Sequence, residues 1–215
     1  MGFYLKHSSF ILRFAGTVSM PQPGSQVGRY YLLEQMGEGA SSIVFSATTN
    51  KHTTCALKLM KSGEGWIGTQ YDREVELLNA LRKVPQIVTM YDHFEFLGAG
   101  VLVLECLDMD LLTYIERSPL ISTEHTKRIF FQVCTAVNAL HTNNVAHLDL
   151  KPENIFLNDI NSVKLGDFGS SFKCTSETYK VLGERGTDFY SAPEVVRHLW
   201  KDNRLINILI ETWTL

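Results

Sequence analysis

The hydrophobic pattern changes near Leu107, and this change favours an α+β fold in two parts. Before it, short apolar runs and glycine or polar breaks predict five β-strands and one helix. The strands are expected at 30–36, 42–48, 54–60, 87–94 and 101–106, and the helix at 72–81. After Leu107 the apolar residues recur at helical spacing. There Ser122 is the expected N-cap of a helix whose apolar face comprises Ile129, Phe130, Val133, Val137 and Leu140.

Composition excludes several classes of protein. The 215 residues, 45% of them hydrophobic, suffice for one sizeable core or two small lobes. A net charge of -3 gives no reason to expect nucleic acid or an anionic membrane as partner. No apolar stretch reaches the ~20 residues that span a bilayer. The four cysteines contain no C-x-x-C pair, so a cytoplasmic location is expected, with the nucleus as a second possibility.

Residues 1–29 are predicted to be a leader or disordered tail. The segment from Met1 to Met20 contains Lys6 and Arg13 but no acidic residue, which resembles a weak organellar presequence. The alternative that we favour is a disordered tail or an upstream start, with Met20 as the true beginning.

A glycine-rich turn lies between the first two predicted strands. It comprises Gly37, Glu38, Gly39, Ala40, Ser41 and Ser42. Glycines let a backbone approach a phosphate closely and expose its N–H groups, although most such turns only close hairpins. The strand-turn-strand context excludes a Rossmann dinucleotide site, which needs a helix after the turn.

Lys58 stands in an otherwise apolar predicted strand, within Ala56-Leu57-Lys58. It is either an edge residue whose stem is buried and whose ammonium reaches water, or an ammonium held for an anion. Glu74 on the predicted helix is placed where it could pair with Lys58.

Three short motifs follow in a fixed order. The run from His147 to Asn154 reads His-Leu-Asp-Leu-Lys-Pro-Glu-Asn, and Asp-Phe-Gly at 167–169 and Ala-Pro-Glu at 192–194 come after it. Together with the glycine turn and Lys58, this set resembles the eukaryotic protein kinase family from Tyr30 to Val196. The resemblance implies a bilobal fold with an N-lobe at 30–106 and a C-lobe at 107–215. It also implies ATP and Mg²⁺ as cofactors, a protein substrate and transfer of the ATP γ-phosphate to a serine or threonine hydroxyl.

The resemblance assigns roles to particular residues. Asp149 would accept or orient the proton of the substrate hydroxyl, and Lys151 would contact the transferred phosphate. Lys58 and Glu74 would form the ion pair that orients the α- and β-phosphates, while Asn154 and Asp167 would be the metal ligands. The alternative for Asp149 and Asp167 is that they are ordinary loop aspartates that cap turns. Lys151 and Thr187 both point to the serine/threonine class.

Further residues are assigned to the nucleotide pocket and the core by the same resemblance. Val44, Ala56, Leu111 and Phe156 would sandwich the adenine, with Leu104 as gatekeeper and the backbone of Glu105 and Leu107 bonding its edge. Leu78, Met90, His147 and Phe168 would stack as a column linking the lobes. Asp108 and Asp110 are interpreted as solvated acids, with contact of one of them to a ribose or to a basic substrate residue as the alternative.

Leu148 departs from the family pattern, because most regulated kinases have an arginine there that pairs with a phosphate on the activation loop. The phrase His-Leu-Asp-Leu-Lys-Pro resembles the death-associated and titin-like, the Mos-like and the Wee-type kinases, and the sequence does not choose among them. A Wee-type likeness would make a tyrosine the acceptor.

The last residues, Glu211 to Leu215, resemble the opening of the central C-lobe helix. We therefore expect a C-terminally truncated kinase whose incomplete C-lobe is unstable or covered by a partner. The competing function is a catalytically inactive kinase-like binding or scaffold module.

Overall fold

The computed structural model describes residues 12–14, 17–19, 21–61, 67–118, 120–159, 162–174, 178–181, 186–187, 189–191 and 206–209. The chain forms two compact units, one of Met1–Glu76 with Thr89–Cys106 and one of Leu77–Val88 with Leu107–Leu215. The predicted lobes, 30–106 and 107–215, differ from these units in the placement of Leu77–Val88. The Ala-Pro-Glu motif at 192–194 and residues 211–215 lie outside the described residues.

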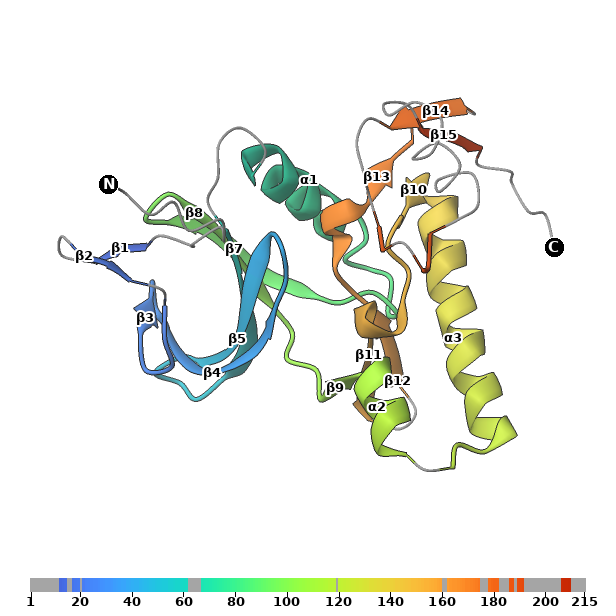
Figure 1. The fold of residues 1–215 in the computed structure, drawn as a ribbon, viewed down its shortest axis with the longest axis horizontal. Coiled ribbons are helices and arrows are strands. Elements are labelled where there is room, and N and C mark those ends of the chain that lie inside the picture. The colour runs from blue at the N-terminus through green and yellow to red at the C-terminus, as the bar shows by residue number, and fades with distance from the viewer. Residues whose placement is uncertain are drawn as a thin grey trace, which may run out of the picture. The chain divides into compact units, whose positions relative to one another are not determined.

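The first unit contains a curled antiparallel sheet of six strands in the order β3-β4-β5-β6-β8-β7 (Figure 1). The five predicted strands are all present. Their bounds are β4 (Tyr30–Glu38), β5 (Ser42–Thr48), β6 (Thr54–Met60), β7 (Met90–Phe96) and β8 (Ala99–Leu104). The predicted strand from 87 starts too early, because Ile87 instead bridges Leu165 within the second unit.

The sixth strand, β3 (Gln26–Val27), corrects the prediction that residues 1–29 form only a leader. Val27 is fully buried in the core of the sheet. A strand of two residues is too short to show alternation, so its pattern could not reveal it. Earlier in the same segment, β1 (Leu12–Phe14) pairs with β2 (Thr17–Ser19).

Only one of the two faces of the sheet forms the hydrophobic core of this unit. Side chains alternate along a strand, so Phe45 on β5, Leu57 on β6 and Val103 on β8 share the face that forms the hydrophobic core. The intervening residues belong to the opposite face, where Val44 pairs with Lys58 across β5 and β6, and Ala56 pairs with Leu104 across β6 and β8. Lys58 therefore leaves the sheet on the side away from its core.

Helix α1 (Ile67–Ala80) begins five residues before the predicted start at Asp72. Its first turn contains Gly68 and Thr69, which are weak helix formers and hide the start from periodicity. The segment around Glu74 is helical as predicted.

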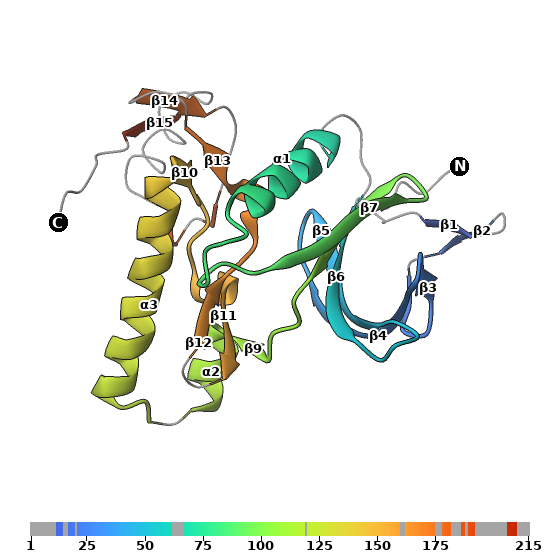
Figure 2. The same ribbon diagram turned by 180° about the vertical axis from the view of Figure 1, so that it is seen from behind.

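Within its described residues, the second unit combines helices with short strands. Helix α3 (Thr123–Thr142) begins after the N-cap Ser122, as expected, and runs beside β12 (Figure 2). The other elements are β9 (Met109–Asp110), α2 (Leu111–Arg117), β10 (Val145–Ala146), η1 (Pro152–Asn154), β11 (Ile155–Asp159), β12 (Ser162–Leu165), η2 (Phe168–Ser170), β13 (Phe172–Lys173), β14 (Thr178–Val181) and β15 (Ile206–Leu209). Among the described residues, no helix combines the length and the apolar character needed to cross a membrane.

The buried face of α3 is narrower than predicted. Ile129, Ala136 and Leu140 are buried, whereas Phe130 is 67% exposed. Consecutive residues point about 100° apart on a helix, so Phe130 cannot share the direction of Ile129. Including Phe130 in the buried face was therefore wrong.

Asp110 is the N-cap of α2 and not simply a solvated acid. Its carboxylate accepts bonds from the Thr113 N–H at 2.8 Å and from the Thr113 hydroxyl at 2.8 Å. Asp108 is exposed, in agreement with its interpretation.

We expect Asp110→Ala to lower the free energy of unfolding by about 1 kcal/mol, because the N-terminal N–H groups of α2 lose their acceptor. The matched control, Asp108→Ala, should change it by less than about 0.5 kcal/mol. Urea unfolding followed by circular dichroism measures both. Equal losses would contradict a capping role for Asp110.

Candidate active site

A buried ion pair joins β6 to α1. The Lys58 Nζ lies 2.6 Å from Glu74 Oε1, and the two side chains are only 5% and 1% exposed. The structure therefore excludes the snorkelling edge lysine, since the ammonium is directed to a carboxylate and not to water. Burying two charges is costly, and good hydrogen-bond geometry is what offsets that cost.

The glycine turn connects β4 to β5 and is largely exposed. Its end is closed by the Gly39 N–H, which donates to Ser42 O at 2.9 Å. A Cβ added at Gly37 or at Gly39 would meet no atom within 4 Å. No described part of the protein therefore fills the space next to these two glycines, and a ligand could approach their backbone there.

The residues predicted to enclose adenine are divided between the units. Val44, Ala56 and Leu104 lie on the same sheet face as Lys58. Glu105 continues from β8, and its N–H donates to Thr89 O at 2.9 Å. The rest of the predicted set, Leu107, Leu111 and Phe156, belongs to the second unit, in which Leu107 is buried and Leu111 and Phe156 are partly buried.

His147 holds the catalytic loop and the Asp-Phe-Gly segment together. The Asp149 N–H donates to His147 Nδ1 at 3.3 Å, while Nε2 is 3.0 Å from Gly166 O. Since Nδ1 is the acceptor, the tautomer that fits carries its proton on Nε2. The ring also packs edge-on against Phe168, as predicted for the stacked column, with centroids 5.2 Å apart.

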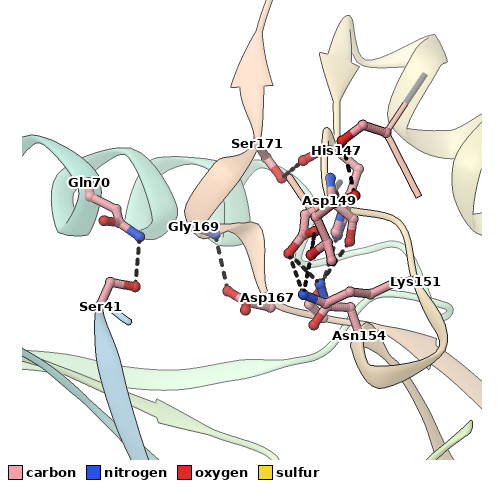
Figure 3. A network of polar contacts seen from close by, with 12 residues as sticks. Ser41, Gln70, His147, Asp149, Lys151, Asn154, Asp167, Gly169 and Ser171 are labelled. Carbon is pink, nitrogen blue, oxygen red and sulfur yellow. Dashed lines mark hydrogen bonds and ion pairs between the residues drawn. The ribbon is translucent and has the colours of Figure 1, made fainter. Parts of the chain in front are cut away.

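Donors surround both carboxylate oxygens of Asp149 (Figure 3). Lys151 Nζ is 3.1 Å from Oδ2, and Asn154 Nδ2 donates to the same oxygen at 3.0 Å. The Thr187 hydroxyl donates to Oδ1 at 2.8 Å and accepts from Lys151 Nζ at 2.7 Å. The three predicted residues Asp149, Lys151 and Asn154 therefore form one cluster.

Asn154 and Asp167 are linked through the backbone. The Gly166 N–H donates to Asn154 O at 2.9 Å, so Asp167 directly follows a residue bonded to Asn154. Asp167 has a left-handed backbone with a φ of 56°, and its exposed carboxylate accepts from the Gly169 N–H at 3.3 Å.

Thr187 bonds to Asp149 and Lys151 in the site. From the sequence, this residue was used only to indicate the serine/threonine class, and these bonds were not predicted. Gly186 next to it has a φ of 84°, and a Cβ there would lie 2.5 Å from Leu148 O. Only glycine therefore lets this segment approach the catalytic loop so closely. The Gly-Thr pair at 186–187 is the sequence signal for the contact.

The comparisons with known proteins agree with this geometry. Residues 30–215 match the family described as "Protein kinase domain". The chain belongs to the protein kinase domain family. That family generally uses ATP and Mg²⁺, and a kinase domain implies protein substrates.

The curated relatives that the chain resembles are named as protein kinases. The chain is 31% identical over 185 residues to the carbon catabolite-derepressing protein kinase of Candida glabrata, an alignment covering 83% of this chain and 30% of that protein. It is 30% identical over 179 residues to the protein of the same name from Saccharomyces cerevisiae, covering 80% and 28%. It is 32% identical over 176 residues to the SNF1-like protein kinase ssp2 of Schizosaccharomyces pombe, covering 79% and 30%. The chain thus spans less than a third of the length of these relatives.

Removing one member of the buried pair should be strongly destabilising. We expect Lys58→Met to lower the free energy of unfolding by about 3–5 kcal/mol, because it leaves the Glu74 carboxylate buried without its cation. Adding Glu74→Leu should recover most of the loss. The measurement is a double-mutant cycle by chemical denaturation. A double variant no more stable than Lys58→Met alone would refute the coupling.

Proposed function

We propose that this chain is the catalytic domain of an ATP-dependent protein serine/threonine kinase. The observation that carries the proposal is a cluster within the second unit, in which Lys151, Asn154 and Thr187 each bond to the Asp149 carboxylate. The family match and the relatives named as protein kinases support phosphate transfer to a protein. The inactive binding module gains no support from these findings.

Asp149 is the proposed base. Its carboxylate would orient the substrate hydroxyl and accept its proton as the oxygen attacks the γ-phosphorus of ATP; the bond from that phosphorus to the β–γ bridging oxygen breaks, and ADP leaves. The donors from Lys151, Asn154 and Thr187 fix the carboxylate in one rotamer. Lys151 also offers a positive charge next to the base, where it would contact the transferred phosphoryl group.

Asn154 and Asp167 fit a magnesium ion. Asn154 Nδ2 bonds to Asp149 O at 2.8 Å and to Asp149 Oδ2, so its Oδ1 is the atom available as an oxygen ligand. No group of three or more His, Cys, Asp or Glu side chains able to hold a metal occurs within the described residues. Mg²⁺ usually binds one or two protein oxygens together with substrate phosphates and water, so Asn154 and Asp167 would suffice as its protein ligands. When bound, the ion would neutralise charge on the phosphates.

The nucleotide is proposed to bind along the sheet face that contains Val44, Ala56, Lys58 and Leu104. There the Lys58 ammonium, held by Glu74, would bind the α- and β-phosphates, and the exposed glycine turn would approach them closely. The Glu105 carbonyl would accept a bond from adenine.

A cytoplasmic or nuclear location is also proposed. All four cysteines, Cys55, Cys106, Cys134 and Cys174, are thiols in the structure, which is the usual state in a reducing compartment. The kinase subfamily and the acceptor protein stay open predictions.

Nucleotide binding should depend on the metal. We expect ATP with Mg²⁺ to raise the midpoint of thermal unfolding, and ATP with EDTA to raise it much less, since the folded state alone binds the complex. Asp167→Asn should abolish the Mg²⁺-dependent part of the shift, and the exposed control Asp108→Asn should leave it unchanged. Equal shifts with Mg²⁺ and EDTA would contradict the metal assignment.

Thr187 should matter for turnover more than for nucleotide binding. We expect Thr187→Val to lower kcat about 10–100-fold with little change in the KM for ATP, because Asp149 and Lys151 lose their shared hydroxyl. Thr187→Ser keeps the hydroxyl and should stay within a few-fold of the unmutated protein. Phosphate transfer to a serine/threonine peptide library measures both, with Asp149→Asn as the background. Equal losses in the valine and serine variants would contradict the proposed role.

A further inference from the structure

Lys61 is a buried lysine that follows β6, three residues after Lys58, and it lies outside the predicted site. The residue is 8% exposed, and its Nζ lies 2.8 Å from Glu38 Oε1 in the glycine turn. The Glu38 side chain is 45% exposed. A buried ammonium needs a hydrogen-bonded anion, and Glu38 supplies it from the edge of the turn.

Lys61 holds the turn at a second point. Its backbone N–H donates to Ser41 O at 2.7 Å, so the same residue bonds the turn at Glu38 and at Ser41. The Ser41 hydroxyl also accepts a bond from Gln70 Nε2 of α1 at 3.3 Å (Figure 3). The conformation of the turn is therefore set from outside the turn.

The position of Glu38 creates an electrostatic problem for an anionic ligand. Glu38 stands between Gly37 and Gly39 in the chain and pairs with Ile43, so its side chain lies on the sheet face opposite to that of Val44. Only the backbone of the turn would separate a bound triphosphate from this negative side chain, and like charges repel at such a separation. The hydrogen bond from Lys61 holds the pKa of Glu38 below its usual value, so the carboxylate is charged at neutral pH.

We propose that Lys61 offsets the charge of Glu38 and thereby allows the glycine turn to accept the triphosphate of a nucleotide. This inference rests on the proposed function, in which that turn binds ATP. Lys61 is a positioning residue in this account. It acts through Glu38 and Ser41 and does not need to touch the nucleotide.

The test compares ATP with adenosine, which has no phosphates, by calorimetric titration of the purified protein. We expect Lys61→Met to weaken ATP binding about tenfold and to change adenosine binding less than about twofold, because only the phosphates meet the exposed charge. Glu38→Gln should bind ATP at least as tightly as the unmutated protein. The double variant should return to within about threefold of it.

The two single variants separate charge compensation from a purely structural tie. If the ion pair only held the turn in shape, breaking it from either side would weaken ATP binding equally, and this result would overturn the proposal. The control Lys51→Met removes the same charge from the exposed hairpin between β5 and β6 and should leave ATP binding unchanged. If Lys51→Met weakened ATP binding as much as Lys61→Met, the loss would depend only on the net charge of the protein. This result would also overturn the proposal.

The outcomes also distinguish this inference from the proposed function. An unmutated protein that binds adenosine and ATP with the same affinity would contradict phosphate binding by the turn itself. An unmutated protein that prefers ATP, with a Lys61→Met variant that prefers it equally, would contradict only the role of Lys61. If Lys61→Met does not fold, Glu38→Gln decides the question, because weaker ATP binding in that variant is the opposite of the expected result.

Discussion

The arrangement of the second unit depends on the buried imidazole of His147. One ring nitrogen accepts the N–H of Asp149, the other is bonded to the carbonyl of Gly166, and the backbone carbonyl of His147 accepts the Ser171 hydroxyl at 3.0 Å. The residues before and after the Asp-Phe-Gly segment are therefore tied to the same histidine. Because these bonds use backbone groups at Asp149 and Gly166, they fix the chain and leave the carboxylates of Asp149 and Asp167 to other partners.

This framework also explains how the catalytic loop forms without an arginine at position 148. Leu148 has a φ of 65°, which is costly for a residue with a Cβ and must be held by its neighbours. His147 on one side and Asp149 on the other provide those contacts. The described donors to the Asp149 carboxylate are Lys151, Asn154 and Thr187. The Leu148 side chain takes part in none of these three contacts. Leucine at 148 thus leaves the geometry of the base intact.

Local patterns in the sequence predicted local structure well. The bounds of β5 and β6 were predicted to the residue, since each strand is a short, mainly apolar run that ends at a turn. The motif set predicted that Asp149, Lys151 and Asn154 would meet, because they share one loop. The start of α1, the two-residue strand β3 and the exposure of Phe130 were missed, since weak helix formers, very short strands and the edge of a helical face leave little periodic signal.

The contacts of Thr187 and Lys61 could not be predicted for a different reason. Thr187 bonds to Asp149 across 38 residues, and Lys61 bonds to Glu38 across 23. A single polar residue that meets a distant partner leaves no pattern in its own neighbourhood. Only the fold, which pairs β4 with β5 and β5 with β6, brings Lys61 into contact with the glycine turn.

In the first unit the glycine turn and the buried ion pair are coupled through α1. Gln70 and Glu74 are four residues apart, so they lie on the same side of the helix about one turn from each other. Glu74 bonds to Lys58 on β6, and Gln70 bonds to Ser41 in the turn. A movement of α1 that separates Glu74 from Lys58 would therefore also release Ser41. The buried pair strongly opposes that movement, because each charge is nearly removed from water and has the other as its counter-ion. The position of one helix thus sets both the lysine proposed to bind the phosphates and the turn proposed to cover them.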